Sequence, residues 1–339
     1  MIAGVAPSRG TTDEDRFLNV AGLPGARSNA SGQTATNFEL YVENQHYVLP
    51  AVALVTGVQW ARSTRKLEDR HVAGTAADPV SENFDMRYHA LNPKLGVRWD
   101  YHPQIQFFAN VSRSFEPPSF SELAGGATPT LNSAQRGTTF EVGSRGRVAA
   151  LEWDVAAYES RLSDELLQIA TNSLGASVTV NAPHTVHRGL EIGLGGGALR
   201  SSSGRIEWRV SGLVNDFRFR DDPTYGNNQL PGLPRYTGRA QLGYRFSNGV
   251  MAQTNVEGAN GYPIDFANSY VADKYVIWGI KASGEVVRGV SWFVEGRNLS
   301  DCKYTATTGV VRNANGADTA QFFPGDGRSV YAGVDWRFN

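Results

Sequence analysis

The sequence predicts an all-β protein, an antiparallel transmembrane β-barrel, and three observations predict it. The first is a strict alternation near the end of the chain, where apolar side chains ending in Trp336 and Phe338 take one face and polar ones such as Asp335 and Arg337 take the other. A period of two indicates a strand with one apolar face, which an outer-membrane barrel turns toward lipid. The second observation is a regular change between short and long connections. The third is a composition that lacks a helical membrane span.

Charge and composition narrow the possible functions. The chain has 339 residues, with 32 basic and 33 acidic side chains, so it offers no net field for nucleic acid and no nucleic-acid partner is expected. No apolar run approaches the roughly 18–20 residues that a spanning helix needs, whereas barrel strands expose only every second residue to lipid. The 37 glycines suit tight turns, and the single cysteine, Cys302, excludes an intramolecular disulfide.

Taken in chain order, the alternation predicts about thirteen strands. Segment 91–99 is typical, because the apolar Leu91, Leu95 and Trp99 alternate with polar residues such as Lys94 and Arg98. The predicted strands are 34–48, 51–66, 88–100, 104–115, 138–147, 151–161, 186–199, 205–219, 236–246, 249–262, 273–285, 289–302 and 328–338.

The predicted connections fall into two classes that alternate along the chain. The short ones are 49–50, 101–103, 148–150, 200–204, 247–248 and 286–288. The long ones, rich in Gly, Asn, Asp, Pro and Ser, are 67–87, 116–137, 162–185, 220–235, 263–272 and 303–327. Outer-membrane barrels have short periplasmic turns and longer extracellular loops, so this segregation supports a barrel. The best candidate for a helical turn is 160–167.

The first 33 residues fit the pattern poorly. If the final strand ends on the periplasmic side, the strand at 34–48 begins outside, and 21–33 belong to an extracellular loop. We therefore expect 1–33 to be a partial extracellular loop with a strand remnant and 34–339 to be barrel. The first ten residues lack the basic and apolar regions of a secretory signal, so a mature or an incomplete protein is expected.

Six segments, in order, resemble the C-terminal barrel portion of TonB-dependent outer-membrane receptors. They are 110–123 (NVSRSFEPPSFSEL), 139–146 (TFEVGSRG), 188–192 (RGLEI), 230–235 (LPGLPR), 296–304 (GRNLSDCKY) and the final strand with its aromatic end. The resemblance covers residues 34–339 and departs from the family at the C-terminus, where Asn339 follows the aromatic Phe338.

The resemblance implies a function for the parent protein. Receptors of this family have a barrel of 22 strands around a plug, and they import ferric siderophores or other scarce, large solutes with energy that TonB delivers through the plug. With about thirteen strands and no recognisable plug, this chain is expected to be an incomplete portion of such a barrel, not transport-competent alone. Its two exposed edges are expected near 34–48 and 328–338.

The resemblance and the chemistry of anionic ferric chelates direct attention to cationic and aromatic residues near loop bases. Arginine offers a bidentate fork for carboxylates. The candidates are Arg113, Arg218, Tyr225, Arg235, Tyr262, Arg312 and Phe322. The alternative for each is a solvated loop residue or a lumenal ion-pair partner. No catalytic, cofactor or metal site is expected, because no nucleophile motif or phosphate-binding loop appears and His184 and His187 fall on opposite faces of an extended segment.

Aromatic residues are expected at the membrane interface, with the outer-membrane lipid of a Gram-negative cell as partner. They are Trp60, Trp99, Trp278, Trp292, Trp336 and Phe338. The last strand is also expected to be recognised by the barrel-assembly machinery. Two alternatives remain open: a smaller closed outer-membrane barrel of 12 or 14 strands that acts as an adhesin or hydrolase, and a soluble all-β binding domain whose core holds these aromatics.

Overall fold

The computed structural model describes residues 1–70, 73–75, 78–80, 82–124, 129–171, 177–317 and 322–338. The elements are β1 (Ile2–Val20), β2 (Leu23–Leu49), β3 (Val52–Asp69), β4 (Ala73–Thr75), β5 (Asp78–Val80), β6 (Phe84–His102), β7 (Ile105–Glu116), α1 (Phe120–Ala124), β8 (Gln135–Val148), β9 (Leu151–Ala170), β10 (Ser177–Ser201), β11 (Gly204–Phe219), β12 (Tyr236–Phe246), β13 (Met251–Ala259), β14 (Tyr262–Pro263), β15 (Val271–Ala272), β16 (Tyr275–Val287), β17 (Val290–Arg297), β18 (Thr305–Thr308), β19 (Phe322–Pro324) and β20 (Ser329–Trp336). Among the described residues, no helix has the length and apolar character needed to cross a membrane.

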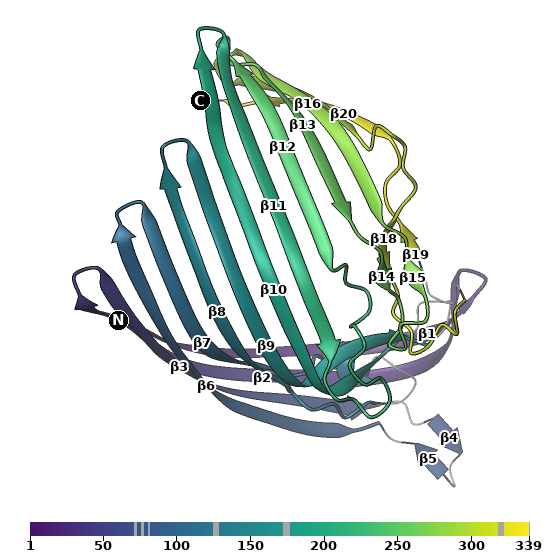
Figure 1. The fold of residues 1–339 in the computed structure, drawn as a ribbon. Helices are drawn as coiled ribbons and strands as arrows, with labels where there is room; N and C mark the ends of the chain where they lie inside the picture. Colours follow the sequence, from purple (N-terminus) through teal and green to yellow (C-terminus); the bar gives the residue numbers. More distant parts are fainter. Residues whose placement is uncertain are drawn as a thin grey trace. The chain divides into compact units, whose positions relative to one another are not determined.

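Fourteen strands form one sheet, in the order β1-β2-β3-β6-β7-β8-β9-β10-β11-β12-β13-β16-β17-β20 (Figure 1). Each strand thus pairs with its neighbour in the chain, which is the topology expected of an antiparallel meander. The all-β prediction is confirmed, with fourteen strands in the place of about thirteen. The short pairs β4–β5, β14–β15 and β18–β19 lie within the long connections and form separate two-stranded sheets.

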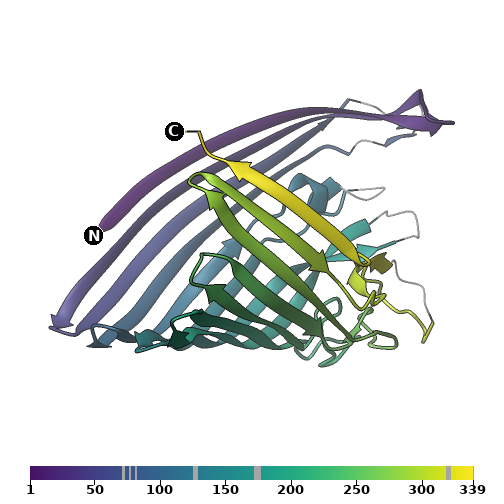
Figure 2. The ribbon, with the colours of Figure 1, turned by 90° about the horizontal axis from the view of Figure 1, so that it is seen from above.

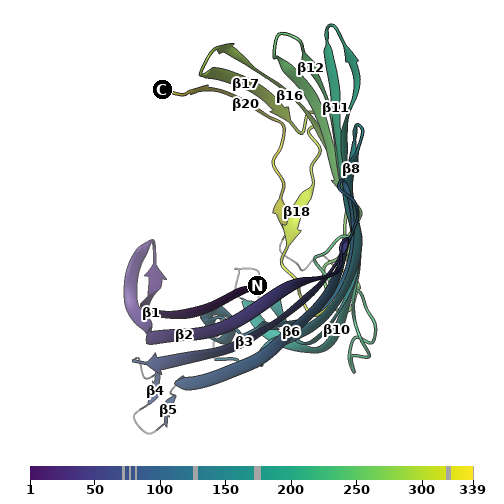
Figure 3. The ribbon, with the colours of Figure 1, turned by 90° about the vertical axis from the view of Figure 1, so that its left-hand side faces the viewer.

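The additional strand is β1, so the expectations for the first 33 residues are corrected. Residues 2–20 pair with β2 from Ile2↔Glu43 to Val20↔Leu23, and a two-residue turn replaces the expected loop at 21–33. Segment 34–48 pairs with β1 on one side and β3 on the other, so the first strand of the order is β1. Figure 3 shows these three strands side by side. Alternation could not reveal β1, because polar residues occupy both faces over its middle, 8–16.

From β2 onward, short and long connections alternate as predicted. Two- to four-residue turns at 50–51, 103–104, 149–150, 202–203, 247–250 and 288–289 join the strands at what we call the turn end, and the long connections join them at the loop end. One expected loop, 162–185, is instead mostly strand, because β9 continues to Ala170 and β10 begins at Ser177. Asp164 has a φ of 54° within β9, and this left-handed residue interrupts the alternation where we expected a helical turn. The short helix is α1.

The chain divides into two compact units. Unit 1 comprises Met1–Val97, Asn110–Thr139 and Leu162–His184, and unit 2 comprises Arg98–Ala109, Phe140–Arg161 and Thr185–Asn339.

In unit 1, the connection that carries α1 folds onto one face of the sheet. Leu123 of α1 is buried with Leu67 of β3 and Phe84 of β6. Arg65 donates from Nε to the carbonyl of Pro118 at 3.0 Å, and from Nη1 to Asn37 Oδ1 at 2.9 Å. A buried arginine needs such acceptors, because an unpaired charge away from water is costly. The loop is therefore fixed both by apolar packing and by a hydrogen-bonded cation.

The N-terminus of α1 provides a testable contribution to this loop. The carboxylate of Glu122 accepts hydrogen bonds from the backbone N and from Oγ of Ser119, both at 2.7 Å. We expect Glu122→Ala to lower the local stability of the loop by about 1 kcal/mol, because both donors then lose a charged acceptor. Hydrogen exchange of the amides at 119–124 measures this. Asp85→Ala is the control, since that carboxylate forms an exposed ion pair with Arg87 at 3.5 Å. Equal protection in both variants would contradict the prediction.

The sheet of unit 2 has one apolar and one polar face, and cross-strand register defines both. One row pairs Trp208, Leu242, Thr254, Ile280, Gly296 and Val330 in succession, and the adjacent row pairs Glu207, Gly243, Gln253, Lys281, Glu295 and Tyr331. We call the faces that carry these rows the apolar face and the polar face. Apolar side chains such as Leu242, 54% exposed, remain open to solvent. In Figure 2, β20 (yellow) ends the sheet beside β17.

The structure places the six predicted interface aromatics mostly on the surface. Trp60, Trp99, Trp278, Trp336 and Phe338 are exposed, whereas Trp292 is half-buried. Several aromatics gather within a few residues of short turns: Trp99 packs with Tyr101 and Phe107 beside turn 103–104, and Trp336 packs with Phe338 at 4.5 Å. Contact with a membrane interface stays a prediction for all six.

Candidate functional site

Three long connections of unit 2 interlock at the loop end. They are 220–235, 260–274 and 298–328, which we call the first, second and third loops. Asn268 of the second loop and Gln229 of the first form a reciprocal pair, with the Gln229 amide donating to Asn268 Oδ1 and Asn268 Nδ2 donating to the Gln229 carbonyl, both at 2.9 Å. Asn228 Nδ2 also donates to the carbonyl of Phe266 at 2.9 Å. These contacts fix the first loop against the second.

Backbone hydrogen bonds join the second loop to the third. The amide of Phe266 donates to the Val311 carbonyl, and the amide of Val311 donates to the Ile264 carbonyl, both at 3.2 Å. The amide of Ala267 donates to the carbonyl of Arg312 at 3.2 Å. Because main-chain atoms make these contacts, the joined segments hold one another as two strands would, whatever side chains they carry.

A buried carboxylate lies at the centre of this junction. Asp265 is 0% exposed and accepts from the amide of Ser269 at 2.9 Å, from Ser269 Oγ at 2.7 Å, from the amide of Tyr270 at 3.3 Å and from the amide of Ala314 at 3.0 Å. It forms no ion pair with any residue that the structure describes. Four donors from two loops thus replace water around the charge, which ties the second and third loops through one side chain.

Aromatic and aliphatic side chains fill the space beneath the loops. The rings of Phe219, Tyr225 and Phe266 lie 5.2–5.4 Å apart in mutual contact. A second cluster contains the buried Tyr262 and Ile264, against which Phe322 packs. Burial raises the pKa of the Tyr262 phenol. The loops therefore have a core of their own and form a preorganised structure at the end of the strands.

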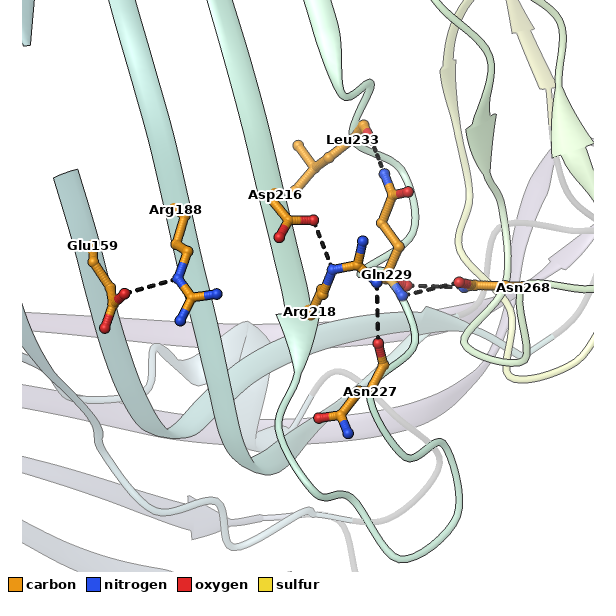
Figure 4. Close-up of polar contacts among 8 residues, drawn as sticks. All are labelled: Glu159, Arg188, Asp216, Arg218, Asn227, Gln229, Leu233 and Asn268. Atoms are coloured by element: carbon orange, nitrogen blue, oxygen red, sulfur yellow. Dashed lines mark hydrogen bonds and ion pairs between the residues drawn. The ribbon is translucent and has the colours of Figure 1, made fainter. Parts of the chain in front are cut away.

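Charged side chains line the apolar face of β9, β10 and β11 toward their loop ends (Figure 4). Glu159 accepts from Arg188 Nε at 2.7 Å, and Asp216 accepts from Arg218 Nε at 2.6 Å. Arg188 pairs across the strands with Asp216, one step beyond the apolar pair Leu190↔Val214. Register therefore places Arg188, Asp216 and Arg218 on the apolar face, beyond its last apolar row.

The polar face is hollowed toward the turn end. A cavity of about 760 Å³ is lined by residues that include Gln106, Arg145, Asp154 and Arg209, and one of about 990 Å³ by residues that include Arg209, Arg245 and Lys281. Within the described residues there is no group of three or more His, Cys, Asp or Glu side chains that could hold a metal. The polar face presents hydrogen-bonding and charged groups to these cavities.

The structure disperses the seven predicted ligand residues. Arg113 lies exposed on β7 in unit 1, and the other six lie in unit 2. Arg235 and Arg312 are exposed, whereas Tyr225, Tyr262 and Phe322 belong to the loop core. Tyr262 is buried, with only 4% of it exposed.

Arg218 also requires a correction of position. Its cross-strand partner is Val186, and it lies on the apolar face with Asp216 rather than among loop residues that face a ligand. The two histidines of β10, His184 and His187, fall on opposite faces as expected for residues three apart in a strand, and the His187 ring stacks on Phe217 at 4.2 Å. A role in ligand binding stays a prediction for each of the seven residues.

Sequence reasoning missed the residues that organise the loops, above all Asp265, Gln229 and Asn268. Their loops show no periodicity, and Asp and Asn in such segments usually make local turns. The available signal was chemical: Asp265 lies between Ile264 and Phe266, so an acidic residue was flanked by large apolar ones inside a polar connection. That pattern favours a buried carboxylate with dedicated donors.

Comparison with known proteins gives a family and a fold. The sequence model of the family described as TonB dependent receptor-like, beta-barrel, matches residues 5–299. Among solved structures, the chain is similar to the ferric citrate transporter FecA in its unliganded form, with a TM-score of 0.76, 15% identity and coverage of 100% of this chain and 52% of that one. It is also similar to the ferric yersiniabactin uptake receptor FyuA from Yersinia pestis, with a TM-score of 0.75, 15% identity and coverage of 99% and 50%.

A third similar structure is the ferric-catecholate import receptor Fiu from E. coli K12, with a TM-score of 0.73, 16% identity and coverage of 98% of this chain and 51% of that one. At these identities the likeness shows a shared fold. The chain spans about half the length of the solved structures that it matches.

Proposed function

Because this chain belongs to the TonB-dependent receptor family, as a β-barrel member, we propose that it forms part of the wall of an outer-membrane receptor that imports a scarce, large solute. A ferric siderophore is the first candidate. The observation that carries the proposal is the match of residues 5–299 to the family's barrel. The exposed apolar face of unit 2 supports a place in lipid, since a barrel wall turns that face outward and its polar face toward the lumen.

The interlocked loops suit the mouth of such a receptor. Anionic ferric chelates favour cations that are exposed and held on a rigid support. Arg312 meets both conditions, because its side chain is exposed and its carbonyl accepts from the Ala267 amide in the second loop. Arg235 is exposed beside Tyr236, with its guanidinium 5.8 Å from the ring centroid. We assign both to ligand contact and Tyr225, Tyr262 and Phe322 to the support beneath them.

The polar face suits the remaining partners of the proposed receptor. The two cavities lined by Arg145, Arg209 and Lys281 offer charged groups to a plug, through which TonB would deliver energy. The final strand, with Trp336 and Phe338 at its end, suits recognition by the barrel-assembly machinery. In this proposal the apolar face contacts lipid, the polar face contacts the plug, and the loops contact the solute.

Uptake of labelled ferric chelates by intact cells tests the proposal. Deletion of the gene that encodes this chain is expected to abolish accumulation of one chelate class among catecholates, hydroxamates and citrate, because the wall and its loops are then missing. A protonophore added to wild-type cells should have the same effect, since import is driven by the proton gradient. Complementation with Arg312→Ala is expected to lower uptake at limiting chelate. Uptake that survives both deletion and protonophore for every class would contradict an energised iron receptor.

A further inference from the structure

A row of charged side chains lies at the loop-end boundary of the apolar face in unit 2. We call it the arginine ladder: Arg161 and Glu159 on β9, Arg188 on β10, and Asp216 and Arg218 on β11. The neighbouring row toward the turn end holds the apolar pair Leu190↔Val214 on the same face. A ligand of the ladder would therefore meet charge on one side and apolar surface on the other.

The two carboxylates hold all three arginines in the same way. Glu159 accepts from Arg188 Nε at 2.7 Å, and Asp216 accepts from Arg218 Nε at 2.6 Å (Figure 4). Glu159 also accepts from Arg161 Nε at 2.7 Å. Each guanidinium is thus oriented through Nε. Its terminal amino groups form no further bond with the described residues, apart from a 3.4 Å contact between Arg218 Nη1 and the Asn227 carbonyl. The side chains of Arg161 and Arg188 are 58% and 57% exposed.

Three guanidiniums against two carboxylates leave one positive charge and several unused N–H groups on a preoriented array. The planar amino fork of arginine matches phosphate oxygens bidentately, and basic residues at membrane level attract anionic headgroups. We propose that the ladder binds the phosphate groups of a phosphorylated lipid in the leaflet at the loop end, whose acyl chains lie on Leu190, Val214 and the apolar rows beyond. The inference rests on the proposed membrane location of the apolar face.

A lipid explains the site better than a free anion or a ligand of the lumen. A free phosphate ion would gain nothing from the half-buried apolar row that adjoins the ladder. A solute entering between the loops and the polar face would meet the opposite side of β10 and β11. The arrangement therefore favours a ligand that carries both phosphate and hydrocarbon, bound where the strands end and the loops begin.

The polar face supplies a matched control. Glu207 accepts from Arg205 Nε at 2.7 Å and from Arg245 Nε at 2.9 Å, so one carboxylate again orients two arginines, but on the other face of the sheet. Replacing this pair removes the same charges from the chain. The loss of these charges should not change the affinity for a lipid that binds the apolar face.

Binding of a phosphorylated glycolipid to the full chain in neutral detergent tests the inference. Native mass spectrometry with bisphosphorylated lipid A, and with the same lipid after removal of its phosphates, measures the apparent affinity. The phosphorylated lipid is expected to bind preferentially. The double variant R161Q/R188Q should bind it about twenty-fivefold more weakly, at about fivefold per arginine, while R205Q/R245Q keeps the wild-type affinity. Arg188→Lys, which keeps the charge but loses the fork, should fall between the two.

Equal losses in both double variants, or no preference for phosphate, would overturn the inference. Displacement of the lipid by inorganic phosphate alone would identify a free-anion site and overturn it as well. Heat-modifiable mobility and protease protection of the wild-type chain in phosphatidylcholine vesicles separate this failure from that of the proposed function. A chain that inserts without phosphate preference retains the membrane location and loses only the ladder's role. A chain that does not insert loses both.

Discussion

Asp265→Ala is expected to release the second and third loops of unit 2 from each other. The carboxylate is fully buried and accepts four hydrogen bonds, from two atoms of Ser269 and from the amides of Tyr270 and Ala314. Alanine leaves these donors without an acceptor and without water. We expect a loss of about 3–5 kcal/mol in local stability, because each bond to a charged group is worth about 1.5–3 kcal/mol and unsatisfied buried donors add a penalty.

Hydrogen exchange measures this effect where it arises. The amides of Ser269, Tyr270 and Ala314 should lose protection, and so should Val311, whose amide bonds across the same junction. Asp222→Ala is the control: Asp222 Oδ1 accepts from the amides of Thr224 and Tyr225 within one turn, so only that turn should open. Unchanged protection at Ala314 would refute the role of Asp265.

Asp265→Asn refines the same prediction. The amide group keeps one acceptor oxygen but turns an NH₂ toward the other side of the site. The Ser269 hydroxyl can rotate to accept from that NH₂, whereas the Ala314 amide can only donate. We therefore expect Asp265→Asn to retain protection at Ser269 and to lose it at Ala314. A uniform loss would instead indicate that the negative charge, rather than the number of acceptors, holds the loops together.

The second large effect is expected on the apolar face. Leu242 is 54% exposed and stands between Trp208 and Thr254 in the apolar row. In a barrel wall this side chain meets hydrocarbon, so Leu242→Arg is expected to cost about 2–4 kcal/mol of folding free energy in a bilayer. Urea titrations of the chain folded into phosphatidylcholine vesicles measure the cost.

A charge of the same kind on the polar face is the matched control. Asn255 pairs with Gln241 and Gly279, and Asn255→Arg adds an arginine to a face that already carries several. Its cost should stay below about 1 kcal/mol, since surface changes away from buried contacts are small. If Asn255→Arg destabilised the chain in vesicles as much as Leu242→Arg, the proposed orientation of the two faces would be wrong.

A strand can be located from the sequence where its side chains alternate with a period of two. In β20, and in β6 from Leu91 to Tyr101, one face is apolar, so a period of two located both strands. In β1 both faces are polar over 8–16, and only the pairing with β2 makes the segment a strand. Local pattern cannot report partners that lie 13 to 29 residues away, from Arg16↔Asn29 to Ser8↔Asn37. The prediction of a helical turn at 160–167 failed for another reason. The left-handed φ of Asp164 shifts the alternation within a continuous strand.

The candidate site was less accessible to sequence reasoning than the fold. Charge and motif position made Arg218 and Tyr262 ligand candidates. Strand register places Arg218 on the apolar face, and packing buries Tyr262. Neither outcome can be read from residue type, because a one-residue change of register exchanges the two faces of a strand. Arg235 and Arg312 are exposed, and their role in ligand binding stays a prediction.

The backbone bonds between the loops also bear on evolution and on protein engineering. In this chain the carbonyls of Val311 and Arg312 in the third loop accept hydrogen bonds from amides of the second loop. Gln229 of the first loop and Asn268 of the second form two hydrogen bonds with each other. A chimera that receives a foreign second loop loses Asn268 and Asp265, whose side chains bond the first and the third loop. Specificity in this chain should therefore be inherited, recombined and transplanted as a block of three loops.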